Sequence, residues 1–202
     1  MYKSVCYTNK QAISTISSLY LQGELHLDAC FARGDFYRGT GLYPEIKHDI
    51  EIKECRDGVV YQVDVRDMPY PDACVRSVMF DPPWLIGDGR YAQAKRYGCF
   101  PTAAAMFDFQ RAAIQEISRV LNPKDWLITK VQDCSHGQQK YFLSVYQVNK
   151  AREFGLYLVD SIVLVNNSRL RSPGAGRLST ISSHCFFHVY KKMQRQRRVD
   201  RY

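Results

Sequence analysis

The tetrapeptide Asp81-Pro82-Pro83-Trp84 combines the residue types best suited to chemistry on a planar amine. It follows an apolar run at residues 78–80, which is typical of a buried β-strand. Two consecutive prolines lack N–H donors and cannot continue a strand ladder, so Asp81 should stand at the strand end. There Asp81 and the Pro82 carbonyl could accept hydrogen bonds from an NH2 group, while the Trp84 ring stacks on its plane. As an isolated tetrapeptide, the same sequence would equally suit an ordinary turn.

Acidic residues also stand at three successive predicted strand ends. Asp28 ends the first strand, and Asp49 follows the second, with Glu54 as the alternative. Asp64 and Asp67 follow a third strand. In an open α/β sheet, ligands bind at the carboxyl ends of the strands. For each acid alone, a helix cap or a turn is at least as good an interpretation, but their recurrence favours a binding site.

These segments resemble the class I S-adenosylmethionine-dependent methyltransferases of the amino-methylating group, which modify exocyclic amines of nucleobases. That group carries an Asp-x-Phe-x-Gly-x-Gly-like cofactor loop before a catalytic loop of the type (Asp/Asn/Ser)-Pro-Pro-aromatic. Residues 28–34 match the first motif and residues 81–84 the second. Ala32 stands where the family usually has its first glycine, and Arg33 separates Ala32 from Gly34.

The resemblance covers residues 24 to about 190. It implies a Rossmann-like α/β fold, with a mostly parallel sheet and an antiparallel last strand. The chain has 202 residues, of which 46% are hydrophobic, enough for a globular core. We therefore expect a single methyltransferase domain over residues 1–190 and a basic tail over residues 191–202.

The resemblance also implies S-adenosylmethionine as the cofactor. Asp28 and backbone amides up to Gly34 would hold its methionine end. Asp49, or Glu54 in its place, would bind the ribose hydroxyls. Asp64 or Asp67 would accept a hydrogen bond from the adenine amine. The expected cofactor residues are Asp28, Ala29, Cys30, Gly34, Asp49, Asp64 and Asp67. No metal site is expected.

A formal charge of +8 and an isoelectric point near 9.1 favour a polyanionic partner. Two segments interleave cations with aromatic residues or glycines, which suits phosphates and unstacked bases. Surface loops or a solvated hairpin tip would give the same pattern. A base in a duplex can be reached only after it is flipped out. The expected nucleic-acid contacts are Arg90, Lys95, Arg96, Arg169, Arg171 and Arg177.

Hydrophobic periodicity predicts alternating helices and strands. Helices are expected over residues 9–20, 107–121 and part of 138–154, and strands over residues 59–65, 75–80 and 126–131. The last two strands, residues 156–165 and 185–190, should be antiparallel neighbours. Seven scattered cysteines without a Cys-x-x-Cys pair indicate a reducing compartment. With no apolar stretch long enough for a bilayer and no signal-peptide core, we expect a cytoplasmic protein, or one in the nucleoid or nucleus, without membrane contact.

Together these patterns predict methyl transfer to an exocyclic amine, most simply adenine N6 in DNA. An RNA base or cytosine N4 remains an alternative target. A non-catalytic methyltransferase-like subunit that binds nucleic acid remains an alternative class, because Ala32 and Arg33 depart from the family pattern. The chain has little room for a target-recognition domain, so specificity would come from short loops, a homodimer or a partner.

Overall fold

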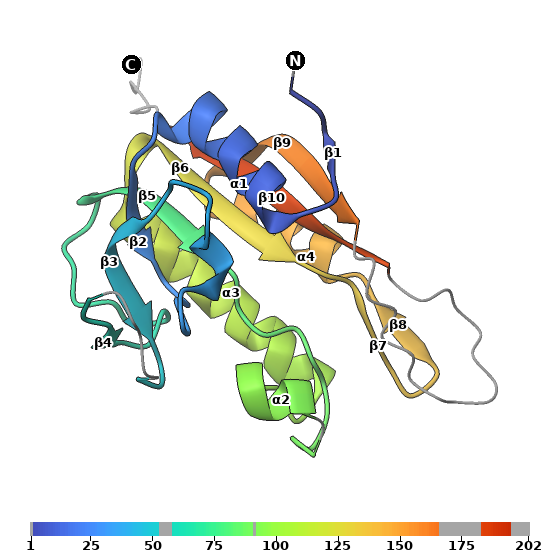
Figure 1. The fold of residues 1–202 in the computed structure, drawn as a ribbon. Coiled ribbons are helices and arrows are strands. Elements are labelled where there is room, and N and C mark those ends of the chain that lie inside the picture. Colours follow the sequence, from blue (N-terminus) through green and yellow to red (C-terminus); the bar gives the residue numbers. More distant parts are fainter. Residues whose placement is uncertain (1, 53–57, 91, 166–182, 195–202) are drawn as a thin grey trace, which may run out of the picture.

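The computed structural model describes residues 2–52, 58–90, 92–165 and 183–194 (Figure 1). The helical elements are α1 (Asn9–Ile16), its π-helical continuation η1 (Ser17–Leu21), the short 3-10 helix η2 (Asp35–Tyr37), α2 (Ala92–Tyr97), α3 (Ala103–Val120) and α4 (Leu143–Glu153). The strands are β1 (Val5–Cys6), β2 (Leu25–Asp28), β3 (Pro44–Asp49), β4 (Tyr61–Gln62), β5 (Val75–Phe80), β6 (Leu121–Val131), β7 (Cys134–His136), β8 (Gln139–Tyr141), β9 (Leu156–Val165) and β10 (His184–Lys192).

The main sheet has the order β1-β9-β10-β6-β5-β2-β3-β4. Neighbours from β6 to β4 pair in parallel, whereas β10 lies antiparallel between β6 and β9. The chain winds outward from β2 in one direction through β3 and in the other through β5. Such a switch point leaves a crevice at the carboxyl ends of the strands. The predicted fold class and the antiparallel pairing of the last two strands are confirmed.

Side chains alternate between the two faces of the sheet, so each central strand supplies both cores. On one face, Met79 and Ile128 pack with α1, including Ile13. On the other face, Phe80 and Leu127 pack with α3 and α4. Figure 1 shows α1 across one side of the sheet and α3 with α4 across the other. Burial on both faces fixes the strand ends where the polar residues emerge.

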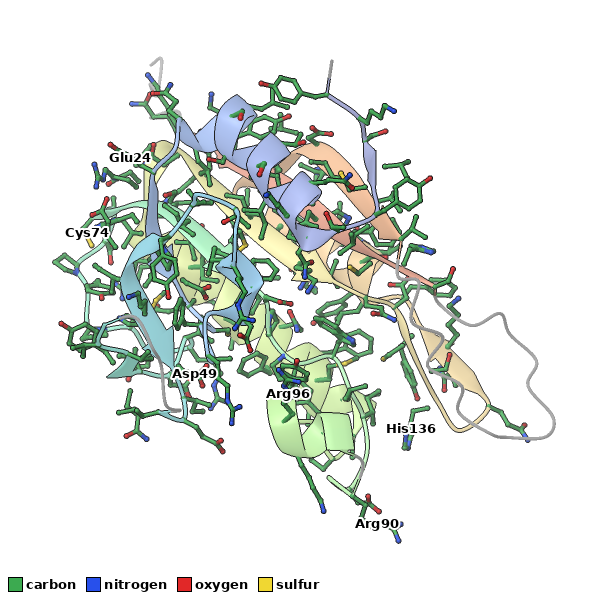
Figure 2. The ribbon with its side chains drawn as sticks, in the orientation of Figure 1. Glu24, Asp49, Cys74, Arg90, Arg96 and His136 are labelled. Atoms are coloured by element: carbon green, nitrogen blue, oxygen red, sulfur yellow. The ribbon has the colours of Figure 1, made fainter. Side chains whose placement is uncertain are left out.

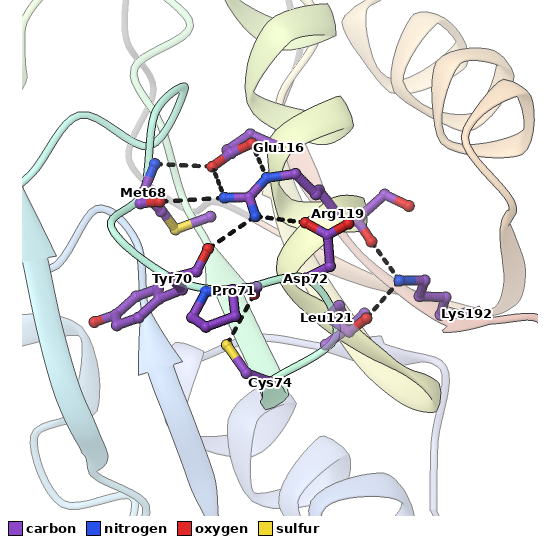
Figure 3. Close-up of polar contacts among 10 residues, drawn as sticks. Met68, Tyr70, Pro71, Asp72, Cys74, Glu116, Arg119, Leu121 and Lys192 are labelled. Carbon is purple, nitrogen blue, oxygen red and sulfur yellow. Dashed lines mark hydrogen bonds and ion pairs between the residues drawn. The ribbon is translucent and has the colours of Figure 1, made fainter.

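The carboxyl end of α3 is held by two cations (Figure 3). The Arg119 guanidinium pairs with Glu116 at 2.6 Å and with Asp72 at 2.7 Å, and it donates to the carbonyls of Met68 and Tyr70. Lys192 on β10 donates to two carbonyls at the end of the same helix, those of Ser118 and Leu121. Cations are favourable there because of the helix dipole. This network fixes the connection that leads from β4 into β5.

Replacing Arg119 by methionine should lower the free energy of unfolding by about 1–3 kcal/mol, because the half-buried Glu116 carboxylate loses its counter-ion and the Tyr70 carbonyl loses its hydrogen-bond donor. The matched control is Arg111→Met, which removes an exposed arginine from the same helix. That change should stay within about 0.5 kcal/mol. Urea unfolding of both variants measures the difference, and equal midpoints would contradict a structural role for Arg119.

Several boundaries differ from the sequence-based expectation. Helix α3 begins at Ala103, earlier than predicted, because Thr102 caps it through the N–H of Ala105 at 3.1 Å. The predicted strand over residues 59–65 reduces to β4, since the turn at Asp64, with the Asp67 N–H bonded to its carbonyl, ends it. Strand β10 reaches Lys192 and so includes two residues assigned to the tail. Among the described residues, no helix is long and apolar enough to cross a membrane.

Candidate active site

Three acidic residues meet at the carboxyl edge of the parallel strands. Asp28 is the last residue of β2, Asp49 is the last residue of β3, and Asp81 directly follows β5. The negative charges of Asp81 and Asp49 are close enough to Asp28 to help raise its pKa. The predicted placement of these acids at strand ends is confirmed, and their part in a binding site stays a prediction. Figure 2 shows Asp49 and Arg96 toward one end of the molecule, and Glu24 and Cys74 toward the other.

Asp28 anchors the start of the loop after β2. Its carboxylate accepts hydrogen bonds from the Cys30 N–H at 2.8 Å and from the Tyr37 hydroxyl. Ala29 donates its own N–H to the carbonyl of Met79 on β5 at 3.0 Å. Burial raises the pKa of Asp28 to about 7, although the hydrogen bonds from Tyr37 and Cys30 oppose the shift. Asp28 thus ties both ends of the loop to the sheet.

Asp49 holds the middle of the same loop. Its carboxylate accepts from the Ala32 N–H at 2.7 Å and from the Glu51 N–H at 3.0 Å, and the side chain is buried. The preceding residue, His48, accepts the Phe31 N–H through its carbonyl at 2.8 Å. A carboxylate has about four lone-pair sites, so Asp49 retains capacity for a further donor such as a hydroxyl.

The loop backbone explains the glycine pattern. Ala32 adopts a φ of +52° and Gly34 a φ of +72°, both in the left-handed region that favours glycine. The position where the resembling family usually has a glycine is therefore occupied here by a strained alanine. At Gly34 a Cβ atom would also lie 2.5 Å from the Cζ atom of Phe31. Glycine is required at Gly34 by space as well as by backbone conformation.

Asp81 presents one bonded and one unbonded oxygen. Its Oδ2 accepts a hydrogen bond from the Lys130 ammonium on β6 at 3.2 Å. Its Oδ1 is buried and has no hydrogen-bond partner within the part of the chain that the structure describes. Burial raises the pKa of Asp81, against the opposing effect of Lys130. A buried acceptor without a partner is costly, so this oxygen is suited to receive a donor from a ligand.

Aromatic rings surround the Lys130 ammonium. The distances from its Nζ atom to the ring centroids are 5.0 Å for Phe36, 5.6 Å for Trp84 and 6.0 Å for Phe187. These rings come from η2, from the segment after β5 and from β10, and we call them the Lys130 cage. Cations are attracted to such ring faces. The predicted catalytic segment Asp81–Trp84 therefore lies beside a cation that the sequence analysis did not identify.

The other predicted residues pair with a neighbouring charge, are exposed to solvent, or lie outside the described residues. Asp64 is bound by Arg66 through contacts of 2.6–3.1 Å, and this pairing lowers the pKa of Asp64, while Asp67 is exposed. Arg90 pairs with Asp88 at 2.6 Å. On α2, Lys95 is exposed, and Arg96 lies 3.4 Å from Asp35. Glu54, Arg169, Arg171 and Arg177 lie outside the described residues.

Two cavities lie near opposite ends of the strands. The larger, about 420 Å³, lies beyond the catalytic segment, where Arg90 and His136 are labelled in Figure 2. Its lining residues are Ile86, Gly87, Asp88, Arg90, Pro101 and His136. The other, about 200 Å³, lies beside Glu24 and Arg76 at the amino-terminal end. The larger cavity is therefore lined by the connection that follows the catalytic segment, and its lining does not include Asp28, Asp49 or Asp81. Among the described residues, no group of three or more His, Cys, Asp or Glu side chains could hold a metal ion.

No protein-family model and no curated protein matches this chain. Solved structures do. A Methanosarcina mazei S-adenosylmethionine-dependent methyltransferase aligns with a TM-score of 0.57 at 12% identity, covering 88% of this chain and 97% of that one. A Burkholderia thailandensis 1,6-didemethyltoxoflavin-N1-methyltransferase, bound to its substrate and S-adenosylhomocysteine, aligns with a TM-score of 0.54 at 16% identity, covering 92% and 79%. The chain has the fold of the S-adenosylmethionine-dependent methyltransferases.

A candidate DNA modification methylase of Thermus thermophilus, complexed with S-adenosylmethionine, aligns with a TM-score of 0.48 at 20% identity and covers 66% of this chain. This chain spans only about half of that protein's length, 55%. At these identities the methyltransferase fold is what the similarity establishes. Function must be inferred from the residues at the edge of the sheet.

Proposed function

We propose that this chain transfers a methyl group from S-adenosylmethionine to an exocyclic amine of a nucleobase, namely adenine N6 in DNA. The observation that carries the proposal is the Asp81 carboxylate, whose Oδ1 is buried and has no partner among the described residues. It stands at the carboxyl edge of β5, in a methyltransferase fold, with the Trp84 ring close by. An amine N–H is the donor that such an acceptor needs, and an indole suits a planar base.

The residues at the ends of β2 and β3 fit the cofactor. Asp28, the loop from Ala29 through Cys30 to Gly34, and Asp49 would hold it, with Asp64 or Asp67 near its adenine. The fit rests on a loop that turns sharply through two left-handed residues between two buried acids. When bound, S-adenosylmethionine supplies an electrophilic methyl group.

The chain's own contribution to the reaction is positioning and hydrogen bonding. An exocyclic amine donates its lone pair into the ring and is a poor nucleophile. If Asp81 and the Pro82 carbonyl accept its N–H groups, the lone pair is concentrated on nitrogen and directed away from those acceptors. Once the methyl carbon has exchanged its bond to sulfur for a bond to nitrogen, the methylated amine would release one proton to water. Pro83 keeps the turn rigid, and Trp84 fixes the plane of the base. Correct placement of two reactants can contribute roughly 7–11 kcal/mol.

DNA is the proposed partner because of the charge of +8 and the cations near the site. Arg90 borders the larger cavity, and α2 carries Lys95 and Arg96 on exposed positions. The pairs of Arg90 with Asp88 and Arg96 with Asp35 are exposed, so they are weak enough to exchange for phosphate. A flipped base is required for Asp81 to be reached.

Replacing Arg169, Arg171 and Arg177 together should weaken DNA binding by a similar factor for different sequences. Each lost phosphate contact should flatten the log–log salt dependence by about 0.9. Fluorescence anisotropy at several salt concentrations measures both quantities, and calorimetry should find cofactor affinity unchanged. An unaltered salt slope would make this segment a plain surface connection.

Replacing Asp49 by alanine should weaken binding of S-adenosylmethionine by about 1–3 kcal/mol, because the loop N–H of Ala32 and the ribose hydroxyls lose their acceptor. The matched control is Glu51→Ala, which removes an exposed carboxylate two residues away and keeps its backbone N–H. Isothermal calorimetry of both variants gives the comparison. Equal affinities for S-adenosylmethionine in the two variants would mean that Asp49 does not bind the ribose. Glu54 would then be the alternative.

A second candidate is a non-catalytic methyltransferase-like subunit that binds nucleic acid or stabilises an active partner. That partner could be a different protein or a second copy of this chain. The observation that favours it is that Asp28 and Asp49 each already accept two hydrogen bonds from this chain. Calorimetry with S-adenosylmethionine separates the two candidates. An absence of binding at millimolar cofactor favours the subunit.

The target base is tested by mass spectrometry of nucleosides from DNA and RNA of cells with and without this chain. We expect N6-methyl-2′-deoxyadenosine to rise in the nucleosides from DNA, with no change in the methylated nucleosides from RNA. A rise of N4-methylcytosine, or of a methylated RNA nucleoside, would identify the alternative targets instead. The Asp81→Asn variant, expressed in parallel, controls for methylation by the host.

A further inference from the structure

We propose that Lys130 is a positioning residue. It binds Oδ2 of Asp81, keeps the carboxylate ionised and leaves Oδ1 facing the target amine. This inference rests on the proposed function and adds to it a residue that the methyltransferase motifs do not contain. Lys130 does not itself touch the amine in this assignment. It acts through Asp81.

The geometry limits where the ammonium can go. Lys130 and Asp81 are both largely enclosed, with 13% and 21% of their side chains exposed, and their charged atoms are 3.2 Å apart. The Lys130 cage faces the ammonium with rings from three different elements. A surface ion pair can dissociate into water at little cost, but this one has aromatic walls in place of water. Lys130 should therefore keep one position, and so should the carboxylate bonded to it.

The charge of the pair matters as much as its position. A buried carboxylate without a counter-ion takes up a proton, because desolvation disfavours the charged form. Protonated Asp81 would carry an O–H donor where the amine requires an acceptor. An ionised acceptor also forms hydrogen bonds roughly twice as strong as a neutral one. Lys130 supplies the counter-charge that keeps Asp81 an acceptor.

Within the described part of the chain, Lys130 is the cation that acts on Asp81. Asp28 from β2, with Cys30 and Tyr37 from the loop after it, lie within electrostatic reach of Asp81. Cys185 from β10 and Tyr97 from α2 lie within reach of Lys130. All of these are acids or neutral groups, and negative neighbours make Asp81 harder to ionise.

The consequence for pH dependence has a definite sign. Methyl transfer should fall as the pH drops through the pKa of Asp81, because only the ionised form accepts the amine N–H. Removing Lys130 should raise that pKa by about one to three pH units, the usual effect of losing an adjacent opposite charge. The acid limb of the rate profile should then shift to higher pH by the same amount.

The direct test is a titration of the full chain by carbon NMR, following the Asp81 carboxyl carbon, which is assigned by its absence in Asp81→Asn. Lys130→Met should raise the midpoint, and Lys130→Arg should restore it. Lys192→Met is the matched control, because it removes a half-buried lysine of β10 that caps α3 instead of contacting Asp81. If Lys130→Met does not fold, Lys130→Gln takes its place. An unchanged midpoint in the folded variant overturns the proposal.

Kinetics complete the test. Lys130→Met should lower kcat more than it changes KM, and it should have no further effect on kcat in an Asp81→Ala background, where Lys130 has no carboxylate to position. Additive losses would overturn the positioning role. If the NMR midpoints shift as expected but the unmodified protein methylates no nucleic acid, the proposed function is contradicted and the positioning role of Lys130 is not. The two failures are therefore distinguishable.

Discussion

Replacing Asp81 by asparagine is expected to lower the rate of methyl transfer by at least about 100-fold, the scale of losing one hydrogen bond that stabilises the transition state. Affinity for S-adenosylmethionine should change by less than about threefold, under 1 kcal/mol. An interaction used mainly in the transition state affects turnover more than ground-state binding. Single-turnover rates and calorimetry measure the two effects separately.

Asparagine is the informative substitution because it preserves the shape of the side chain and a carbonyl oxygen for Lys130. Although the motif of the resembling family also allows asparagine, Lys130 should hold that oxygen here, so that the NH2 donor of the amide faces the target amine. Alanine would leave the enclosed Lys130 ammonium without a partner, and breaking a buried pair in this way costs about 3–5 kcal/mol of stability. The control is Asp88→Asn, which removes an exposed carboxylate from the same connection. Turnover near that of the unmodified protein in Asp81→Asn would remove Asp81 from the mechanism.

Replacing Gly34 by alanine is expected to disrupt the cofactor loop, whereas Gly39→Ala should be much milder. The two glycines have almost the same backbone conformation, with φ of +72° and +69°. A Cβ at Gly39 has no neighbour within 4 Å, but at Gly34 it meets the Phe31 ring at 2.5 Å and the Tyr43 hydroxyl at 3.0 Å. Phe31 cannot easily retreat, because it is buried and contacts the rings of Tyr37 and Tyr43.

The left-handed backbone alone should cost either variant about 1–2 kcal/mol. Overpacking should cost Gly34→Ala about 1–3 kcal/mol more, with a weakened affinity for S-adenosylmethionine. Urea unfolding and calorimetry of the two variants give both numbers. Equal losses of stability would mean that Phe31 moves aside freely, and that the loop is less tightly packed than the contacts indicate.

The strand-end acids could be predicted from sequence because their signals are local. The apolar run before Asp81 and the two prolines after it predict a strand end, and Asp28 follows the alternating leucines of residues 25–27. The signal at Asp49 was weaker, because residues 44–49 are mostly polar, and Glu54 was the alternative. The hairpin of β7 and β8 was missed because residues 134–141 are mostly polar. Its one local signal was Gly137, which adopts a φ of +62° in the two-residue turn.

Lys130 was missed for a different reason. A lysine inside a strand of buried residues is unusual, and that was an available signal. Its partner, however, is set by the register of β6 against β5, in which Phe80 lies opposite Thr129. Its aromatic neighbours come from segments near residues 36, 84 and 187. No local sequence pattern indicates which residues a strand register brings together. The pairing of Lys130 with Asp81 could therefore be found only once the sheet was known.

The central place of β10 also has a consequence for protein synthesis. This strand supplies Phe187 to the Lys130 cage and is hydrogen-bonded to both β6 and β9. The residues before His184 leave the ribosome before β10 does. Until β10 emerges, β6 and β9 lack the strand that lies between them, and the Lys130 cage lacks the Phe187 ring. Chains fold from the amino terminus as they are made. If the proposed function is right, a nascent chain should therefore lack methyltransferase activity until β10 pairs with β6 and β9.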